Sequence, residues 1–156
     1  SEDVLGVELG GALKNVIAIS AGIVEGLGFG SNTRAVLFAR GVAEMARLGA
    51  AMGARRETFM GLSGLGDLAT TCLSPHSRNR WLGEEIGKGK KLRNVLKGTE
   101  MVVEGVDTSR SAWQLAKKNK ITMPITKAVY GILFHHHDPR EAVKALMKRE
   151  PHRELD

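Results

Sequence analysis

The segment from Leu9 to Leu27 most constrains how this chain can fold, because it is long, apolar and rich in glycine. Its apolar residues recur every three or four positions, which is the spacing of one face of an α-helix. Glycine weakens an isolated helix by about 1 kcal/mol relative to alanine, so the many glycines here need another explanation. We therefore expect a buried helix whose glycines let other backbones approach closely. The glycines on or beside this face are Gly10, Gly11, Gly22 and Gly26.

A second helical pattern covers residues 33–52, with its apolar residues turned inward and Glu44 expected on the opposite, solvent side together with three arginines. Ser31 or Asn32 suits the N-cap of this helix. A short helical turn at 55–60 and a glycine-rich turn at 61–67 are expected to follow.

Helical spacing of apolar residues continues through the rest of the chain, and no strand-like alternation is sustained anywhere. Ser77 is placed to cap a helix that reaches Ile86. Three later helices are expected to begin at Asp107 or Thr108, at Pro124 and at Pro139. The sequence predicts an all-α domain over residues 1–150 and a frayed polar tail at 151–156. A chain of 156 residues is long enough to bury such a core without disulfides or metals.

The net charge of +6 is concentrated in one stretch. Residues 76–97 hold seven Lys or Arg against two Asp or Glu, which gives +5. A diffuse basic surface would favour nucleic acid, whereas a local cluster equally suits a small anionic ligand or a solvated helix face. We expect no nucleic-acid partner, since Trp81 is the one aromatic residue there. We also expect no membrane span and no secretory signal, and a single cysteine fits a reducing cytoplasm.

Three features that suggest specialised chemistry have plainer explanations. The glycine-rich segments at 26–30 and 61–66 follow no predicted strand and match neither a dinucleotide fingerprint nor a P-loop, so turns and packing explain them better. His135, His136 and His137 point about 100° apart if helical, which favours a solvated helix end over a metal site. Cys72 has no evident catalytic partner and suits a buried thiol. We predict no metal site.

Lys14 is the strongest candidate for chemistry, because it interrupts the otherwise apolar first helix beside Asn15. A partly buried lysine can exchange a proton during catalysis, although the spacing alone favours the wet face of an amphipathic helix for Lys14. Asp67 follows a tight glycine turn and is also a possible helix cap. The run at residues 77–79 joins a hydroxyl, a guanidinium and an amide at a helix start, which favours phosphate binding as much as a simple cap with an exposed arginine.

Together these motifs resemble one family. They resemble the C-terminal domain of the bacterial glycerol-3-phosphate dehydrogenases, which shows the same segments in the same order and spacing over most of the chain. The segments are Gly10-Gly11-Ala12-Leu13-Lys14-Asn15-Val16, Gly64-Leu65-Gly66-Asp67-Leu68, Thr71-Cys72 and Ser77-Arg78-Asn79.

The resemblance implies a helical domain like the C-terminal domain of the 6-phosphogluconate dehydrogenase superfamily, joined in the complete enzyme to an N-terminal Rossmann domain that is absent from this chain. It implies reversible hydride transfer between NAD or NADP and C2 of glycerol 3-phosphate, giving dihydroxyacetone phosphate, in support of phospholipid synthesis. A homodimer in the cytoplasm is expected. The fragment alone is expected to be inactive.

The resemblance also implies residue roles. Lys14 would exchange the proton and Asp67 would assist it. The remaining substrate contacts would come from Asn15, Thr71, Ser77, Arg78 and Asn79, and Arg78, Val102 and Glu104 would reach the cofactor. Two alternatives stay open, namely the helical domain of another Rossmann-linked hydroxyacid dehydrogenase and a basic anion- or nucleic-acid-binding module.

Overall fold

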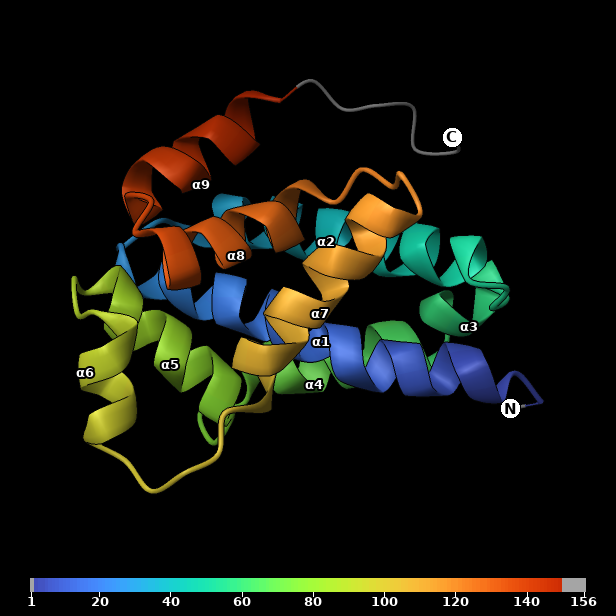
Figure 1. Ribbon diagram of the computed structural model, residues 1–156, viewed down its shortest axis with the longest axis horizontal. Coiled ribbons are helices and arrows are strands. Elements are labelled where there is room, and N and C mark those ends of the chain that lie inside the picture. The colour runs from blue at the N-terminus through green and yellow to red at the C-terminus, as the bar shows by residue number, and fades with distance from the viewer. Residues whose placement is uncertain (1, 150–156) are drawn as a thin grey trace.

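The computed structural model describes residues 2–149, and all regular structure in that range is helical (Figure 1). This confirms the all-α prediction for the described range, whereas the expected fraying at 151–156 lies outside it. The elements in chain order are α1 (Val4–Gly26), α2 (Ser31–Ala51), α3 (Arg56–Met60), the π-helical turn η1 (Leu62–Gly66), α4 (Asp67–Leu73), α5 (Arg78–Gly87), α6 (Leu92–Lys97), α7 (Glu104–Lys118), α8 (Pro124–His135) and α9 (Pro139–Lys148).

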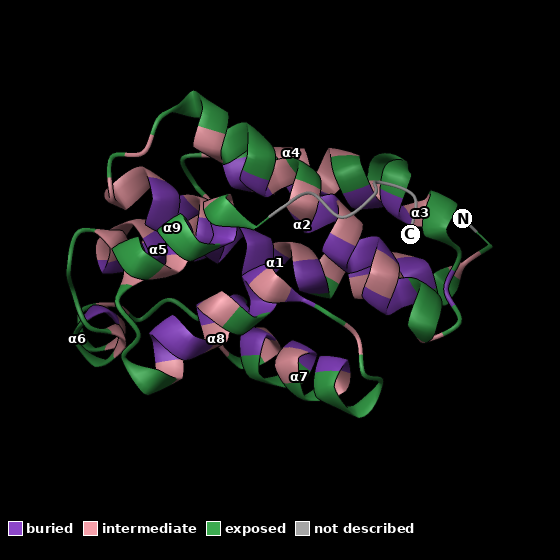
Figure 2. Ribbon diagram, turned by 90° about the horizontal axis from the view of Figure 1, so that it is seen from above, coloured by how far each residue is buried: buried purple, intermediate pink, exposed green. Residues whose placement is uncertain are grey.

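Helix α1 runs through the centre of the molecule, and α2, α4, α5, α7 and α8 pack around it (Figures 1 and 2). The helix begins five residues earlier than predicted, because the Asp3 carboxylate accepts a hydrogen bond from the Gly6 N–H at 3.0 Å and caps the extra turn. By length and mean hydropathy α1 could cross a membrane, contrary to the expectation that the chain has no such run. Most of its apolar window is buried inside the fold, as in the core helix of a globular domain.

Glycines bring α1 and α5 into backbone contact, as expected from their position on the apolar face. A Cβ atom added at Gly22 would lie 1.9 Å from the Arg80 carbonyl oxygen, and one at Gly83 would lie 2.0 Å from the Ile19 carbonyl oxygen. One turn further along, Gly26 and Gly87 continue this contact. A Cβ atom added at Gly87 would lie 2.5 Å from the Ile23 carbonyl oxygen. We call these four glycines the α1–α5 glycine seam. Gly11 does not share this role, since a Cβ there would meet nothing within 4 Å.

The solvent-side prediction for Glu44 is wrong, because this residue is 2% exposed between α2 and α8. Its carboxylate accepts hydrogen bonds from the Ile125 N–H at 2.5 Å, and from the N–H and hydroxyl of Thr126 at 3.2 Å each. No side chain within α8 caps that helix, so Glu44 supplies the acceptors that its first turn needs. Burial raises the pKa of Glu44 to about 7, although the hydrogen bonds oppose the shift.

Other boundary predictions are confirmed or corrected locally. Ser77 caps α5, accepting from the Arg80 N–H at 3.2 Å, and Pro124 and Pro139 start α8 and α9 as expected. Gly30, rather than Ser31 or Asn32, occupies the N-cap of α2, and no side chain bonds there. Helix α7 begins at Glu104, before the predicted Asp107 or Thr108, and α6 was not predicted.

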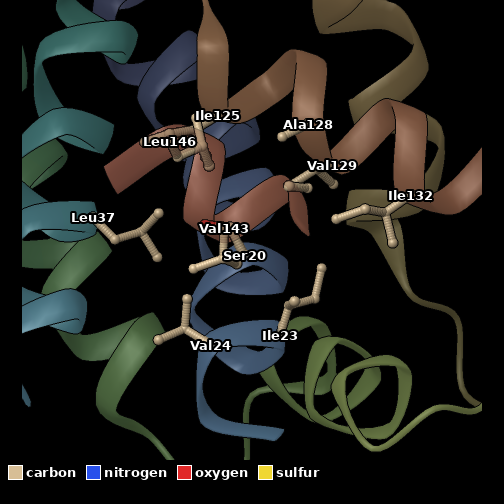
Figure 3. Close-up of a pocket in the computed structure, with 11 residues that line it drawn as sticks. Ser20, Ile23, Val24, Leu37, Ile125, Ala128, Val129, Ile132, Val143 and Leu146 are labelled. Carbon is tan, nitrogen blue, oxygen red and sulfur yellow. The ribbon is translucent and has the colours of Figure 1, made fainter. Parts of the chain in front are cut away.

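The small cavity shown in Figure 3 has a volume of about 10 Å³ and is lined mainly by apolar side chains of α1, α2, α8 and α9. That is about the space of a single water-sized probe, far below the several hundred Å³ of a typical small-molecule site. This cavity is therefore a gap in core packing, and a polar ligand needs a site at the surface.

Candidate active site

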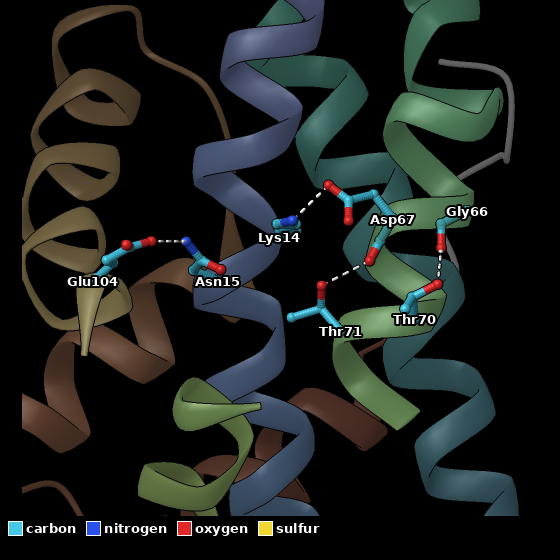
Figure 4. A network of polar contacts seen from close by, with 7 residues as sticks. All are labelled: Lys14, Asn15, Gly66, Asp67, Thr70, Thr71 and Glu104. Carbon is cyan, nitrogen blue, oxygen red and sulfur yellow. Dashed lines mark hydrogen bonds and ion pairs between the residues drawn. The ribbon is translucent and has the colours of Figure 1, made fainter. Parts of the chain in front are cut away.

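Lys14 and Asp67 meet where α1 passes the start of α4. The Lys14 Nζ lies 2.5 Å from the Asp67 Oδ2, which makes a charge-assisted hydrogen bond between residues 53 positions apart (Figure 4). The side chains are 21% and 41% exposed, so the pair is reachable from solvent while Leu13 beside it is buried. The structure thus brings the two predicted catalytic residues together.

The π-helical turn η1 delivers Asp67 to this position. The Asp67 N–H donates to the carbonyl oxygens of Leu62 and Gly64, and α4 starts at once behind it. The predicted glycine turn is therefore a wider helical turn, and Asp67 opens α4 rather than capping it with its side chain. The Thr71 hydroxyl donates to the Asp67 carbonyl oxygen at 2.7 Å, one turn along α4. Its predicted contact with substrate stays a prediction.

Glu104 contacts residues of two other helices, on the side of α1 away from Asp67 (Figure 4). The Asn15 Nδ2 of α1 donates to the Glu104 Oε2 at 3.3 Å, and the Arg78 Nη2 of α5 lies 4.0 Å from the Glu104 Oε1. Asn15 is 6% exposed and follows Lys14 in the sequence, and the two side chains point to opposite sides of α1 (Figure 4). The hydrogen bond between Asn15 and Glu104 was not predicted, because no sequence pattern pairs residues 15 and 104.

The 77–79 run lies at the start of α5 with its three side chains in different settings. Ser77 is the cap, and the Arg78 side chain is 47% exposed. Asn79 is 8% exposed, and its Oδ1 accepts from the Gly105 N–H at 2.8 Å, which ties α5 to α7. Asn79 therefore has a structural contact of its own, and its role toward substrate remains a prediction.

Val102 lies two residues before Glu104, just ahead of α7, and is 68% exposed. The side chains of Arg78 and Glu104 are also accessible to solvent. These are the three residues for which the family resemblance implies contact with the cofactor.

Cys72 is buried and the three consecutive histidines are exposed, as expected for a structural thiol and a solvated helix end. Burial raises the pKa of the Cys72 thiol to about 12, so its nucleophilic thiolate form is disfavoured. His135, His136 and His137 are exposed at the end of α8. Within residues 2–149, no group of three or more His, Cys, Asp or Glu side chains is arranged to hold a metal ion.

Part of the basic stretch at 76–97 is neutralised locally. Lys88 pairs with Glu84 at 2.6 Å and with Glu85 at 3.6 Å, and Lys90 also pairs with Glu85. Because Glu84 and Glu85 both pair with Lys88 or Lys90, the net positive charge of the stretch comes from its other basic residues. The Arg78 guanidinium, 4.0 Å from the Glu104 carboxylate, is the basic group of the stretch that lies beside the site.

Residues 3–144 match the family model described as NAD-dependent glycerol-3-phosphate dehydrogenase C-terminus. The chain is 57% identical, over all of its 156 residues, to 47% of a glycerol-3-phosphate dehydrogenase [NAD(P)+] from Syntrophotalea carbinolica. It is also 57% identical, over 94% of its length, to 43% of such a protein from Salinibacter ruber. The chain therefore spans slightly less than half of these relatives.

Solved structures show the same fold. Glycerol-3-phosphate dehydrogenase from Coxiella burnetii superposes with a TM-score of 0.93 at 42% identity, covering 96% of this chain and 46% of that one. The enzyme from Saccharomyces cerevisiae superposes with a TM-score of 0.83 at 28% identity, covering 94% of this chain and 43% of that one.

Proposed function

Because this chain belongs to the family of NAD-dependent glycerol-3-phosphate dehydrogenase C-terminal domains, we propose that it forms the substrate-binding half of such an enzyme. The reaction is reversible hydride transfer between NAD or NADP and C2 of glycerol 3-phosphate, with dihydroxyacetone phosphate as the ketone. The observation that carries the proposal is the Lys14–Asp67 pair, an accessible ammonium and carboxylate 2.5 Å apart, with Lys14 on a helix that is mostly buried around it.

Lys14 exchanges the proton on the C2 oxygen. In ketone reduction its ammonium donates a proton to that oxygen, and in alcohol oxidation its amine accepts the hydroxyl proton. The positive charge of the ammonium also stabilises the negative charge that develops on the oxygen during reduction. Asp67 orients the ammonium through the 2.5 Å contact, and Asn15 and Thr71 lie next to the pair along α1 and α4.

Arg78 binds the substrate phosphate. Its guanidinium stands at the N-terminal end of α5, where backbone N–H groups and the helix dipole also favour an anion. Ser77 and Asn79 flank it and complete the phosphate site. A phosphate held there is remote binding energy that fixes C2 next to Lys14, which lowers the barrier through positioning.

The residues around the start of α7 fit a nicotinamide cofactor. Val102 offers an exposed apolar surface for a ring, whereas Glu104 and Arg78 offer an acceptor and donors for its polar groups. The cofactor supplies the hydride when it is bound. No nucleotide-binding loop occurs in this chain, so the main cofactor site belongs to an N-terminal Rossmann domain with which this domain pairs. We place the enzyme in the cytoplasm as a homodimer that supplies glycerol 3-phosphate for phospholipid synthesis.

A chimera tests this proposal. In it, the chain replaces the matching 47% of the Syntrophotalea carbinolica relative. We expect the chimera to oxidise NADH or NADPH with dihydroxyacetone phosphate, and the isolated chain to show no turnover. A folded chimera that binds the cofactor but leaves dihydroxyacetone phosphate unreduced would refute the assigned reaction. Turnover by the isolated chain would refute the claim that it is inactive alone. Reduction of a 2-keto acid instead would favour the hydroxyacid dehydrogenase alternative.

A further inference from the structure

Resting on the proposed function, we propose that Gly10 is a positioning residue for the reaction. By lacking a side chain it sets how closely α1 approaches the η1–α4 segment, and it thereby holds the Lys14 amine against Asp67. Gly10 touches neither substrate nor cofactor in this account, and acts through the ion pair alone.

The two segments contact each other in a matched register. Gly10 precedes Lys14 by four residues on α1, so the two lie one turn apart on the same face. Ser63 precedes Asp67 by four residues on the other segment. A Cβ added at Gly10 would lie 3.0 Å from the Ser63 carbonyl oxygen, while Lys14 meets Asp67 at 2.5 Å. The first contact therefore lies about 6 Å along α1 from the second, at 1.5 Å per residue.

Movement at Ser63 is transmitted to Asp67 through the backbone of η1. The Asp67 N–H is bonded to the carbonyl oxygens of Leu62 and Gly64, the two neighbours of Ser63. A shift of the Ser63 carbonyl by a few tenths of an ångström displaces this hydrogen-bonded turn and the carboxylate it carries. Because π-helical turns occur often at functional sites, a role for η1 in linking the position of Ser63 to that of Asp67 agrees with its geometry.

The turn η1 is also packed against α3, so it cannot move away from α1 without disturbing that contact. A Cβ at Gly64 would lie 2.2 Å from the Phe59 carbonyl oxygen, which shows how tightly η1 rests on α3. Phe59 is fully buried, and its ring fills the space over Gly49 of α2, where a Cβ would be 2.2 Å from the ring. An added methyl at Gly10 must therefore push apart α1 and η1, and this separates Lys14 from Asp67.

Gly11 provides a matched control on the same helix. A Cβ there would meet nothing within 4 Å, and alanine at either position raises the helix propensity of α1 equally. A second control is Gly66 in η1 itself, where a Cβ would touch only the Leu62 side chain, at 3.4 Å, and the backbone is already helical. The three substitutions add the same methyl group and differ in what it meets.

The experiment uses the chimera described above. We expect Gly10→Ala to lower kcat about tenfold, since a misplacement of 1 Å costs on the order of 100-fold. KM for dihydroxyacetone phosphate should stay within about twofold, because Arg78 lies on α5. Gly11→Ala and Gly66→Ala should keep both the kcat and the KM of the unmodified chimera.

A double-mutant cycle separates positioning from a general loss of folded protein. Asp67→Glu alone should lower kcat, whereas in the Gly10→Ala background its longer side chain should recover part of the lost activity. KM for dihydroxyacetone phosphate does not depend on the amount of active protein, so it reports on the fraction that remains folded. Equal kcat for Gly10→Ala and Gly11→Ala would overturn the proposal, as would an Asp67→Glu effect of the same size in both backgrounds. Turnover by the unmodified chimera upholds the proposed function in either case.

Discussion

Replacing Glu44 with glutamine should change how the stability of the domain depends on pH. Glu44 is 2% exposed, and burial raises its pKa from 4.5 to about 7. A carboxyl whose pKa is raised by folding stabilises the native state at low pH, where it is protonated in both states. That contribution is lost as the pH rises from about 4.5 through 7, because the native state must then ionise a buried group.

The size of the effect follows from the shift. Each pKa unit corresponds to about 1.4 kcal/mol, so the shift amounts to about 3 kcal/mol. Since Glu44 is almost completely buried, solvent screening takes little from this figure. The carboxyls of Asp3 and Glu85 contribute with the opposite sign, because hydrogen bonds from Thr58 and Lys90 lower their pKa values. The difference between wild type and Glu44→Gln isolates the Glu44 contribution from theirs.

Urea unfolding followed by circular dichroism, from pH 4.5 to pH 8, measures this difference. Glutamine keeps acceptors for the N–H groups of Ile125 and Thr126 but cannot ionise. Relative to Glu44→Gln, wild type should therefore lose about 3 kcal/mol of unfolding free energy across the range. Glu8→Gln, at an exposed position on α1, gives the baseline for removing one carboxyl. A difference that stays constant with pH, or grows in favour of wild type toward pH 8, would refute the reasoning.

Three further predictions concern the site and the core. In the chimera, Lys14→Ala should lower kcat by roughly 10³-fold while NADH binding, followed by fluorescence, is retained; substantial remaining turnover would remove Lys14 from the proton-transfer role. Arg78→Ala should raise KM for dihydroxyacetone phosphate by roughly 10- to 100-fold, the worth of a charge-assisted contact, and an unchanged KM would place the phosphate elsewhere. Gly83→Ala should lower the unfolding free energy of the chain by about 2–4 kcal/mol, because the methyl group would overlap the Ile19 carbonyl oxygen; a thermal melt as high as that of Gly11→Ala would contradict this.

The parts of the fold set by local chemistry could be predicted from the sequence. The apolar period and the glycines of the Leu9–Leu27 segment indicated a buried helix in close contact with other backbones, and the Ser77 cap and the two prolines placed three helix starts. Glu44 shows the limit of this reasoning. Helical periodicity puts it among charged residues, and only the tertiary structure reveals that the first turn of α8 needs its carboxylate.

The candidate site divides in the same way. Lys14 and Asp67 could be named from their sequence surroundings and the family resemblance, but their 2.5 Å contact depends on how α1 meets η1. The glycine turn at 61–67 gave no sign of a π-helical turn, since glycine permits many backbone paths. Asn79 likewise combines a recognisable motif position with a hydrogen bond to Gly105 that no local pattern encodes.

The α1–α5 glycine seam has a consequence for which substrates the proposed site would accept. Lys14 and Arg78 belong to two helices whose backbones touch, and such a contact cannot be compressed or made to slide without steric overlap. The backbone therefore fixes the spacing between Lys14 and the start of α5. Under the proposed function, we expect a phosphorylated ketone with a longer carbon chain to fold or strain itself to reach both residues, so that discrimination by chain length would come from the backbone rather than from the side chains that contact the substrate.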